Sequence, residues 1–306
     1  MLTLSCIGAG RLGQTLCHLL SQRSDISIGQ IINSNQVSSQ RAVDFIGCGS
    51  AATIDDLKQA DIWLIATPDN QIESAVKQLH TSAVLKPETV IFHCSGLLPS
   101  SVLQNKQQDL NVASVHPIHS FADPKRSINT FSGCHCAIEG SANAVTQLDA
   151  LFSSLGTLTF TLDSQQKSLY HAASVMACNY LVSLLEVSHQ MLKEAGIDEA
   201  VIDEAVINST ENSSPLEPLI RQTLDNYFAL GATQALTGPI ARGDTETVET
   251  HIKALQQAPD ADLLKQLYSA LGKATLPISA KQGQASKQQL TAIAAALDNM
   301  VNHEDR

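Results

Sequence analysis

Short apolar runs alternate with helix-length segments over the first 161 residues. The runs are LTLSCIG, ISIGQII, DIWLIAT, TVIFHC, NVASVH, HCAIEG and TLTFTL. Their length and β-branched content predict strands, and their alternation with amphipathic stretches is typical of βαβ units. Such units build a mostly parallel sheet with helices on both faces. We therefore predict an α/β domain with a doubly wound sheet over residues 1–161.

The rest of the chain follows a different period. After residue 163 the strand pattern stops, and apolar residues recur with a period of 3.6. The longest such stretch runs from Ser164 to Ala195, and Gly196 is placed to end it. Further helices are predicted at 198–211, 216–230, 244–257, 260–274 and 286–301. The pattern thus predicts a second, all-helical domain over residues 162–306.

Composition and charge narrow the classes of protein that fit. The 306 residues are 43% hydrophobic and 16% charged, as in folded globular chains, and the net charge is −11. An acidic chain lacks the basic footprint of nucleic-acid binding or of adhesion to an anionic membrane. The start has no basic leader, and no run approaches the ~18 apolar residues of a membrane span. We expect a cytoplasmic protein without nucleic-acid or membrane partners.

The seven cysteines give little sign of a metal site. Most stand singly in apolar surroundings, and only Cys134 and Cys136 are close together. The sequence Cys134-His135-Cys136 could be a fragment of a zinc site, but no second pair of ligands follows at zinc spacing. We expect structural, reduced cysteines and no metal centre.

The strongest motif stands at the beginning of the chain. Gly8-Ala9-Gly10-Arg11-Leu12-Gly13 has the pattern G-x-G-x-x-G between a predicted strand and an amphipathic helix. In dinucleotide-binding folds the first glycine permits the turn, the second lets a pyrophosphate approach, and the third lets helix and strand pack closely. The helix N-terminus then offers free N–H groups to the phosphates. We predict dinucleotide binding here, the alternative being a glycine turn of another α/β protein.

The residues after the second predicted strand bear on which dinucleotide binds. NAD enzymes usually have an acidic residue there for the ribose 2′-OH, but Asp25 precedes this strand. Asn33, Ser34 and Asn35 follow it, with Arg41 further on. This loop would not repel a 2′-phosphate, and its side chains could hydrogen-bond to one. NADP is therefore favoured over NAD, although Arg41 could instead be a solvated helix residue.

Three further strand-end loops supply candidate site residues. Thr67 and Pro68 follow one predicted strand and could pack on the ribose and nicotinamide, while Ser95 follows the next. His116 and His119 lie in the third loop, where imidazoles can transfer protons or bind anions. Ordinary turn chemistry is the alternative for the first two loops. A metal site is less favoured for the histidines, because no Cys, Asp or Glu accompanies them.

These motifs, in this order, carry a resemblance that covers nearly the whole chain. GAGRLG, ATPD, HCSG and HPIHSF are followed by YHAASVMACNYLVSLLEVSHQMLKEAGI, ALTGPIARGD and TVETHI. The chain resembles Rossmann-like proteins with a C-terminal domain of unknown function 2520. More distantly it is similar to the 6-phosphogluconate dehydrogenase superfamily, including β-hydroxyacid dehydrogenases, pyrroline-5-carboxylate reductase and prephenate dehydrogenase. The resemblance implies an NADP-binding Rossmann domain, a helical C-terminal domain and a homodimer joined through those helices.

One departure from the superfamily concerns the proton carrier. In the hydroxyacid members a catalytic lysine stands one helical turn before an asparagine; Asn179 matches that asparagine, but position 175 is Val. His171 lies two turns before Asn179 on the same predicted face. We therefore expect His171 to replace the lysine as general acid or base, with Asn179 orienting the substrate. Structural hydrogen bonds are the alternative for both side chains.

The segment 237–244 is a further candidate for the site. It has glycines near both ends, Pro239 stiffens it, and Arg242 projects from it. Arg242 could hold a substrate carboxylate, or it could form an internal ion pair. Together these residues predict an NADP-dependent oxidoreductase acting on a small carbonyl, imine or hydroxyl compound in a cleft between the domains. The alternatives are a non-catalytic NADP-binding sensor, suggested by Val175, and a purely structural dimer.

Overall fold

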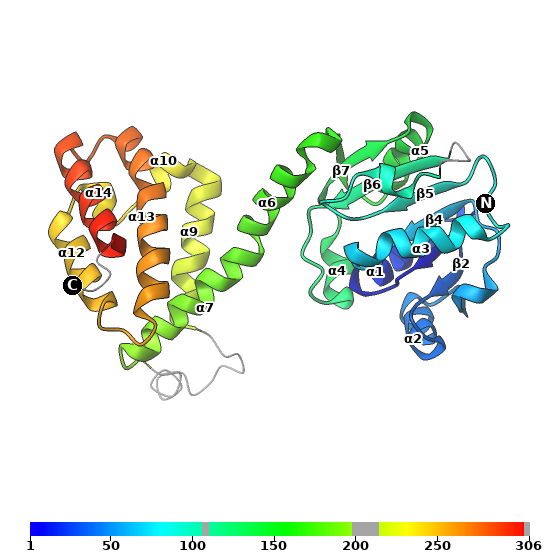
Figure 1. Cartoon of the computed structure of the whole chain (residues 1–306), viewed down its shortest axis with the longest axis horizontal. Helices are drawn as coiled ribbons and strands as arrows, with labels where there is room; N and C mark the ends of the chain where they lie inside the picture. Colours follow the sequence, from blue (N-terminus) through cyan, green and yellow to red (C-terminus); the bar gives the residue numbers. More distant parts are fainter. Residues whose placement is uncertain (106–109, 198–213, 303–306) are drawn as a thin grey trace. The chain divides into compact units, whose positions relative to one another are not determined.

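The structure is a computed structural model that describes residues 1–105, 110–197 and 214–302. It divides into two compact units, Met1–Val182 and Ser183–Arg306 (Figure 1). The last strand ends at Thr161, which is the boundary predicted from the hydrophobic pattern. The first unit nevertheless continues through the next helix, because the side chains at the start of that helix pack on the sheet. The helix predicted at 198–211 lies outside the described residues.

One sheet of eight strands organises the first unit, with the order β3-β2-β1-β4-β5-β6-β7-β8 (Figure 1). All neighbouring strands are parallel except β6 and β7. The doubly wound α/β class is thus confirmed. The pattern missed β3, which is too short for an alternation to show. The strands are β1 (Leu2–Ile7), β2 (Ile26–Ile32), β3 (Ser50–Ala52), β4 (Ile62–Ile65), β5 (Val90–His93), β6 (Asn111–Pro117), β7 (His135–Gly140) and β8 (Leu158–Thr161).

Two apolar cores lie on opposite faces of this sheet. Because side chains alternate along a strand, Leu64 and Phe92 enter one core while Trp63, Ile65 and Ile91 enter the other. The first core is covered by α1 (Arg11–Ser21), α2 (Gln36–Ile46) and α5 (Ala142–Ser153), with α4 (Pro124–Thr130) beside α1. The second is covered by α3 (Asp69–Thr81) and the short helix η2 (Ser100–Leu103), near η1 (Ile54–Asp56). Burial on both faces explains why the strands are continuous apolar runs.

The long helix predicted from Ser164 is divided in the structure. It consists of η3 (Ser164–Gln166), α6 (Lys167–Ala177) and α7 (Asn179–Glu194), with Cys178 between the last two at φ −114° and ψ −70°. Asn179 therefore begins a new helix, and its side chain is exposed. The single face that the sequence places through residues 171, 175 and 179 is interrupted.

The stretch Ser164–Glu194 also differs from the expectation that no segment approaches a membrane span. Its 31 residues contain an 18-residue window of mean hydropathy 1.2, and none of that window is buried. By length and composition alone it could cross a membrane. The mean hydropathy of a helix can be high even when the helix contains Ser, His and Tyr. These residues interrupt the unbroken apolar run that the sequence criterion requires. The absence of a membrane partner stays a prediction.

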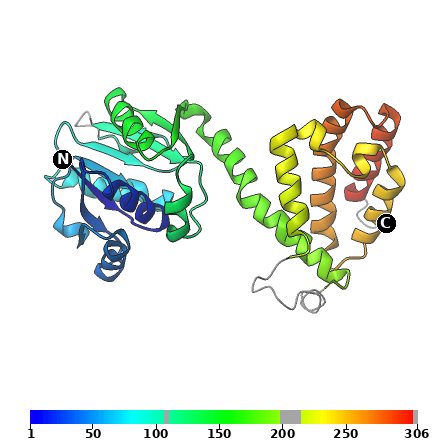
Figure 2. The ribbon, with the colours of Figure 1, turned by 180° about the vertical axis from the view of Figure 1, so that it is seen from behind.

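The second unit is helical throughout its described residues, as predicted. Figure 2 shows these C-terminal helices, coloured yellow to red. Their core lies among α11, α12, α13 and α14 and contains Ile240, Val248, Ile252, Ile293 and Leu297. Helix α13 is longer than the predicted 260–274, because it continues through Pro277 instead of ending before it. The helices are α9 (Glu217–Leu230), α10 (Ala232–Ala235), α11 (Pro239–Arg242), α12 (Thr245–Leu255), α13 (Ala261–Gln282) and α14 (Lys287–Asn302).

Candidate functional site

The three glycines of the motif, two before α1 and one in its first turn, have distinct environments. Gly8 has φ +88°, and a Cβ there would lie 2.5 Å from the backbone nitrogen of Thr67. A Cβ on Gly13 would lie 3.1 Å from the carbonyl oxygen of Gly8, where helix and strand pack together. Gly10 differs, because a Cβ there would meet nothing closer than 4.0 Å. The first glycine thus makes the turn, the third allows packing, and the second faces open space.

That open space is a cavity of about 720 Å³ at the carboxyl ends of β1, β2 and β4. From β1 the chain adds β2 and β3 on one side of the sheet, and from β4 onwards it adds strands on the other side. Doubly wound sheets bind ligands at this switch point between β1 and β4. Eight predicted cofactor residues line it. They are Gly8, Ala9, Gly10, Asn33, Ser34, Arg41, Thr67 and Pro68.

The other predicted cofactor residues have positions of their own. Arg11 is exposed at the first position of α1, Leu12 packs against the first core, and Gly13 is buried. The side chain of Asn35 accepts a hydrogen bond from the backbone N–H of Ser38 and so caps α2. These four residues shape the two helix N-termini beside the cavity without being among the residues that line it.

The lining of the cavity carries a single kind of charge. Arg41 is the one charged residue among the described lining residues, and no carboxylate is among them. Ser34 and Ser38 line the same end, at the start of α2. The sequence reading did not single out Ser38, although it lies one helical turn before position 41 and therefore shares its face. This end of the cavity therefore offers a positive charge and two hydroxyl groups.

Thr67 provides a separate sign that a polar ligand fits this cavity. Its Oγ1 is buried and has no hydrogen-bond partner among the described residues. A buried hydroxyl without a partner is costly, by about 1–3 kcal/mol, unless a ligand or water satisfies it. Together with the open side of Gly10, this hydroxyl fits the polar groups of a bound dinucleotide.

A hydrogen bond joins the cavity to the loop after β5. Asp69 begins α3 directly after Pro68, and its Oδ2 accepts a hydrogen bond of 2.6 Å from Ser95 Oγ. Ser95 Oγ also accepts bonds from the backbone N–H groups of Leu97 and Leu98. The Ser95 hydroxyl therefore donates one hydrogen bond and accepts two. This geometry favours a structural role for Ser95 over the predicted catalytic one.

His93, at the end of β5, is fully buried and holds the same loop. Its Nδ1 accepts a bond from the Ser95 N–H, so its Nε2 donates to the carbonyl oxygen of Pro99. Burial lowers the pKa of His93 to about 4, and the nearby charge of Lys167 acts in the same direction. His93 is thus a neutral histidine with a fixed tautomer.

Acidification is expected to destabilise the first unit through His93. The unfolded state binds a proton near the ordinary pKa of 6.5, whereas folded His93 binds one only near pH 4. Stability is therefore complete above pH 6.5 and is lost as the pH falls towards 4, by about 3 kcal/mol at the lower end. Denaturant unfolding at pH 7.0, 5.5 and 4.5 would measure this slope. The variant His93→Asn should make the slope shallower without abolishing it, because buried His116, whose pKa is also lowered to about 4, contributes a slope of its own. A slope equal to that of the natural protein would contradict the assignment.

Two other imidazoles meet beside the loop, His116 from the end of β6 and His171 from α6. Their ring centroids are 5.7 Å apart, with planes at 71°. A Cβ on Gly96 would lie 2.4 Å from His171 Cδ2 and 2.9 Å from His116 Nε2. Only glycine lets the loop approach both rings this closely. Two predicted catalytic residues are thus brought together next to the cavity.

Two residues that the sequence reading missed complete this cluster. The hydroxyl of Tyr170 lies 2.6 Å from His116 Nδ1. Lys167 is 1% exposed, donates a 2.7 Å hydrogen bond to Ser114 Oγ and lies 3.5 Å from Glu139 Oε1. Lys167 lies two turns before position 175, and its ammonium group points to Ser114 of β6 and Glu139 of β7. Its spacing from Tyr170 and His171 on one helix is the sequence signal.

The remaining predicted site residues have the following surroundings. His119 packs against Phe121 and Phe131, and its Nε2 is 3.0 Å from Thr130 Oγ1, so it does not pair with His116. Asn179 is exposed at the start of α7. Arg242 is exposed at the end of α11 in the second unit, and its catalytic role stays a prediction.

The described cysteines and acidic groups form no metal centre. Within residues 1–105, 110–197 and 214–302, no group of three or more His, Cys, Asp or Glu side chains could hold a metal ion. Cys134 and Cys136 are free and buried. Both belong to the first apolar core, together with Cys6, Cys17 and Cys94.

Comparison with known proteins agrees with this architecture. Residues 1–117 match the model of a Rossmann-like domain, and residues 134–275 match that of a domain of unknown function, DUF2520. No curated protein matches the chain.

Solved structures with the same fold cover most of the chain. A protein of Thermotoga maritima is 23% identical with a TM-score of 0.68, covering 91% of this chain and 99% of that one. A Bacteroides fragilis protein, provisionally described as an NADP oxidoreductase, is 20% identical with a TM-score of 0.71 over 90% and 98%. An imine reductase from Myxococcus stipitatus in complex with NADP⁺ is 16% identical with a TM-score of 0.57 over 95% and 99%. At these identities the likeness shows the fold, and the family models identify a Rossmann-like domain followed by a domain of unknown function 2520 in this chain.

Proposed function

We propose that the protein is an NADP-dependent oxidoreductase for a small carbonyl, imine or hydroxyl compound. The observation that carries the proposal is the adjacency of two features within the first unit. The cavity beside Gly10 and Thr67 fits a dinucleotide, and the Asp69–Ser95 hydrogen bond joins it to the loop that touches His116 and His171. A nicotinamide dinucleotide bound there would supply or accept the hydride of such a reaction. Two structural neighbours support the same reaction class, one described as an NADP oxidoreductase and the other as an imine reductase in complex with NADP⁺.

Each end of the cavity would hold a different part of the cofactor. The first turn of α1 would present its free backbone N–H groups to a pyrophosphate, and the missing side chain of Gly10 leaves room for it, whereas the N–H groups of Gly8 and Gly10 already donate to the carbonyl oxygens of Ile32 and Gly8. The buried Thr67 hydroxyl would donate or accept a hydrogen bond near the ribose and nicotinamide. Arg41, Ser34 and Ser38 would hold a 2′-phosphate, because a guanidinium binds phosphate oxygens bidentately.

Replacing Arg41 by alanine is expected to change cofactor preference. Loss of the guanidinium should weaken NADPH binding by about 10–100-fold, the effect of one or two charge-assisted hydrogen bonds, and leave NADH binding nearly unchanged. Calorimetric titration of each cofactor measures both. The variant Arg126→Ala removes an exposed arginine from α4 and should bind like the natural protein. Equal losses for NADPH and NADH would contradict the role of Arg41.

The imidazole pair would act on the substrate. His116 is held neutral, since burial lowers its pKa to about 4 and the neighbouring His171 and Lys167 act in the same direction. His171 is half-buried and lies on the other side of Gly96. Between them the two rings can donate a hydrogen bond to a reacting oxygen or nitrogen and exchange a proton with it.

The test of catalysis is the variant His171→Gln, assayed for NADPH oxidation with a panel of small keto and imino compounds. Turnover should fall by about 10²–10⁴-fold, the usual contribution of an acid–base group, while NADPH affinity stays within about twofold. The matched control is His135→Gln, which changes an exposed histidine of the same unit. A loss of cofactor binding in His171→Gln would contradict a catalytic role. Full turnover in His171→Gln would contradict the acid–base role of His171, whereas no NADPH oxidation by the natural protein with any compound of the panel would favour the non-catalytic sensor.

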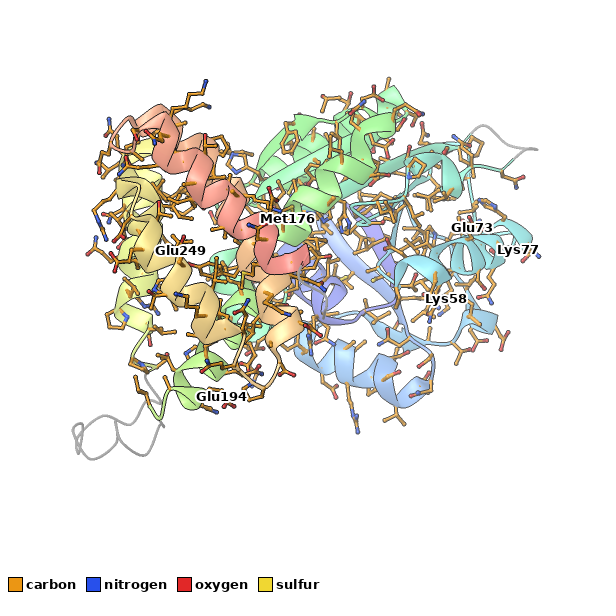
Figure 3. The ribbon with its side chains drawn as sticks, turned by 60° about the vertical axis from the view of Figure 1, so that its left-hand side comes forward. Lys58, Glu73, Lys77, Met176, Glu194 and Glu249 are labelled. Carbon is orange, nitrogen blue, oxygen red and sulfur yellow. The ribbon has the colours of Figure 1, made fainter. Side chains whose placement is uncertain are left out.

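A second copy of the chain is the proposed macromolecular partner. Apolar side chains are exposed on α9, including Leu219, Tyr227 and Phe228, and Met176 on α6 is 66% exposed (Figure 3). Each helix thus exposes large apolar side chains, and exposed apolar surface of this kind indicates a site that a partner covers. Light scattering of the purified protein would give twice the 32.7 kDa chain mass for a dimer.

A further inference from the structure

The contact between Tyr170 and His116 fixes one side of the His116 ring. The Tyr170 hydroxyl lies 2.6 Å from Nδ1, and the two rings meet edge to face with planes at 89°. Tyr170 lies one turn after Lys167, whose buried bonds to Ser114 and Glu139 hold the start of α6 on the sheet. The phenol is therefore held in place from the helix side as well as from β6.

The proton in this contact can lie in two ways. Burial raises the pKa of Tyr170 to about 12 and lowers that of His116 to about 4, so both groups are neutral near pH 7. Either the phenol donates to Nδ1, or an Nδ1–H donates to the phenol oxygen. In the second case the phenol proton would have no acceptor among the described residues. In the first case the phenol O–H donates and Nδ1 accepts, and the single ring proton of His116 lies on Nε2.

We propose that Tyr170 is a positioning residue that holds His116 in the tautomer protonated on Nε2. The Nε2–H is then the group that His116 offers to a substrate oxygen or nitrogen. The role of the ring in catalysis rests on the proposed function, whereas the tautomer itself follows from the Tyr170 contact.

The surroundings of Nε2 agree with this assignment. A Cβ on Gly96 would lie 2.9 Å from Nε2, so the missing side chain leaves that nitrogen accessible. Within the described part of the chain Nε2 has no hydrogen-bond partner. The charged and titratable groups that act on the ring are His171, Lys167 and Asp69, besides Tyr170 itself. A neutral donor thus points at the space beside the loop.

The contact also provides a source for the proton. When a substrate oxygen takes the Nε2 proton, that N–H bond breaks and an O–H bond forms. Nδ1 takes the phenol proton in the same movement, which returns the ring to a neutral form with the proton on the other nitrogen. A phenolate is left on Tyr170, and it regains a proton from water. Water is the acid that supplies this proton and leaves as hydroxide, so charge and protons balance.

The tautomer is measured by long-range ¹H–¹⁵N NMR spectra of the full chain, labelled with ¹⁵N-histidine, at pH 7. The signals of His116 are identified by their loss in His116→Gln. The proposal predicts a bare Nδ1 and a protonated Nε2 in the natural protein. In Tyr170→Phe, which keeps the ring contacts with Phe160 and His116, the Nδ1–H population should rise about tenfold and move both ¹⁵N shifts towards each other.

The controls separate this result from the proposed function. Tyr227→Phe, in the second unit, should leave the His116 signals unchanged. A protonated Nδ1 in the natural protein, or an unchanged spectrum in Tyr170→Phe, would overturn the proposal. The spectra are recorded without a dinucleotide. A failure to bind NADPH would therefore refute the proposed function and leave the tautomer assignment standing.

Discussion

Replacing Lys167 by methionine is expected to lower the free energy of unfolding of the first unit by about 3–5 kcal/mol. The Lys167 side chain is 2% exposed, and that of Glu139 is 11% exposed. Both carboxylate oxygens of Glu139 are engaged, because Ser100 donates its backbone N–H to one and its hydroxyl to the other, each at 2.7 Å. Methionine matches the length of lysine but leaves this carboxylate buried without its cation.

The measurement is denaturant unfolding followed by the fluorescence of Trp63, the one tryptophan of the chain, which is fully buried in β4. The double variant Lys167→Met with Glu139→Gln removes both charges and should recover most of the loss. Lys77→Met changes an exposed lysine on α3 and should unfold like the natural protein (Figure 3). A loss below about 1 kcal/mol in the single variant would show that the pair does not hold the unit together.

Replacing Gly10 by valine is expected to abolish dinucleotide binding while the fold persists. Gly10 has φ −75° and ψ −154°, which any residue can adopt, and a Cβ would meet nothing closer than 4.0 Å. The new side chain would instead occupy the space where a pyrophosphate approaches α1. NADPH affinity should fall at least about 100-fold, while the free energy of unfolding stays within about 1 kcal/mol.

A reciprocal control makes this result specific. Gly47 has φ +88° with open space around it, so Gly47→Ala should lower stability by about 1 kcal/mol through backbone strain alone. It lies at the C-terminus of α2 and is not among the cavity-lining residues, so NADPH binding should be retained. NADPH binding by Gly10→Val at its natural affinity would place the cofactor elsewhere.

The hydrophobic pattern predicts the sheet well because the strands are buried on both faces. It identifies seven of the eight strands, missing only β3, since three residues such as Ser50–Ala52 carry no period. The G-x-G-x-x-G motif is equally informative, because strand, turn and helix are adjacent in sequence. The cavity lining then follows from the ends of β2 and β4, which sequence reasoning places at one edge of the sheet.

The acid–base cluster is harder to predict because its contacts are distant in sequence. Lys167 meets Ser114 across 53 positions, and Tyr170 meets His116 across 54. Helical spacing puts positions 171, 175 and 179 on one predicted face. In the structure the lysine near His116 and His171 is Lys167, and a new helix begins at Asn179. Local spacing describes one helix face, but it does not show which strand that face meets.

The central claim is that the cavity beside Gly10 binds a nicotinamide dinucleotide. Its most direct test is isothermal titration of the purified protein with NADPH, NADP⁺, NADH and NAD⁺ in parallel. We predict saturable binding of NADPH and NADP⁺ with 1:1 stoichiometry per chain, at least about tenfold tighter than NADH and NAD⁺ because of Arg41. Absence of binding by all four would contradict the account and leave only the fold.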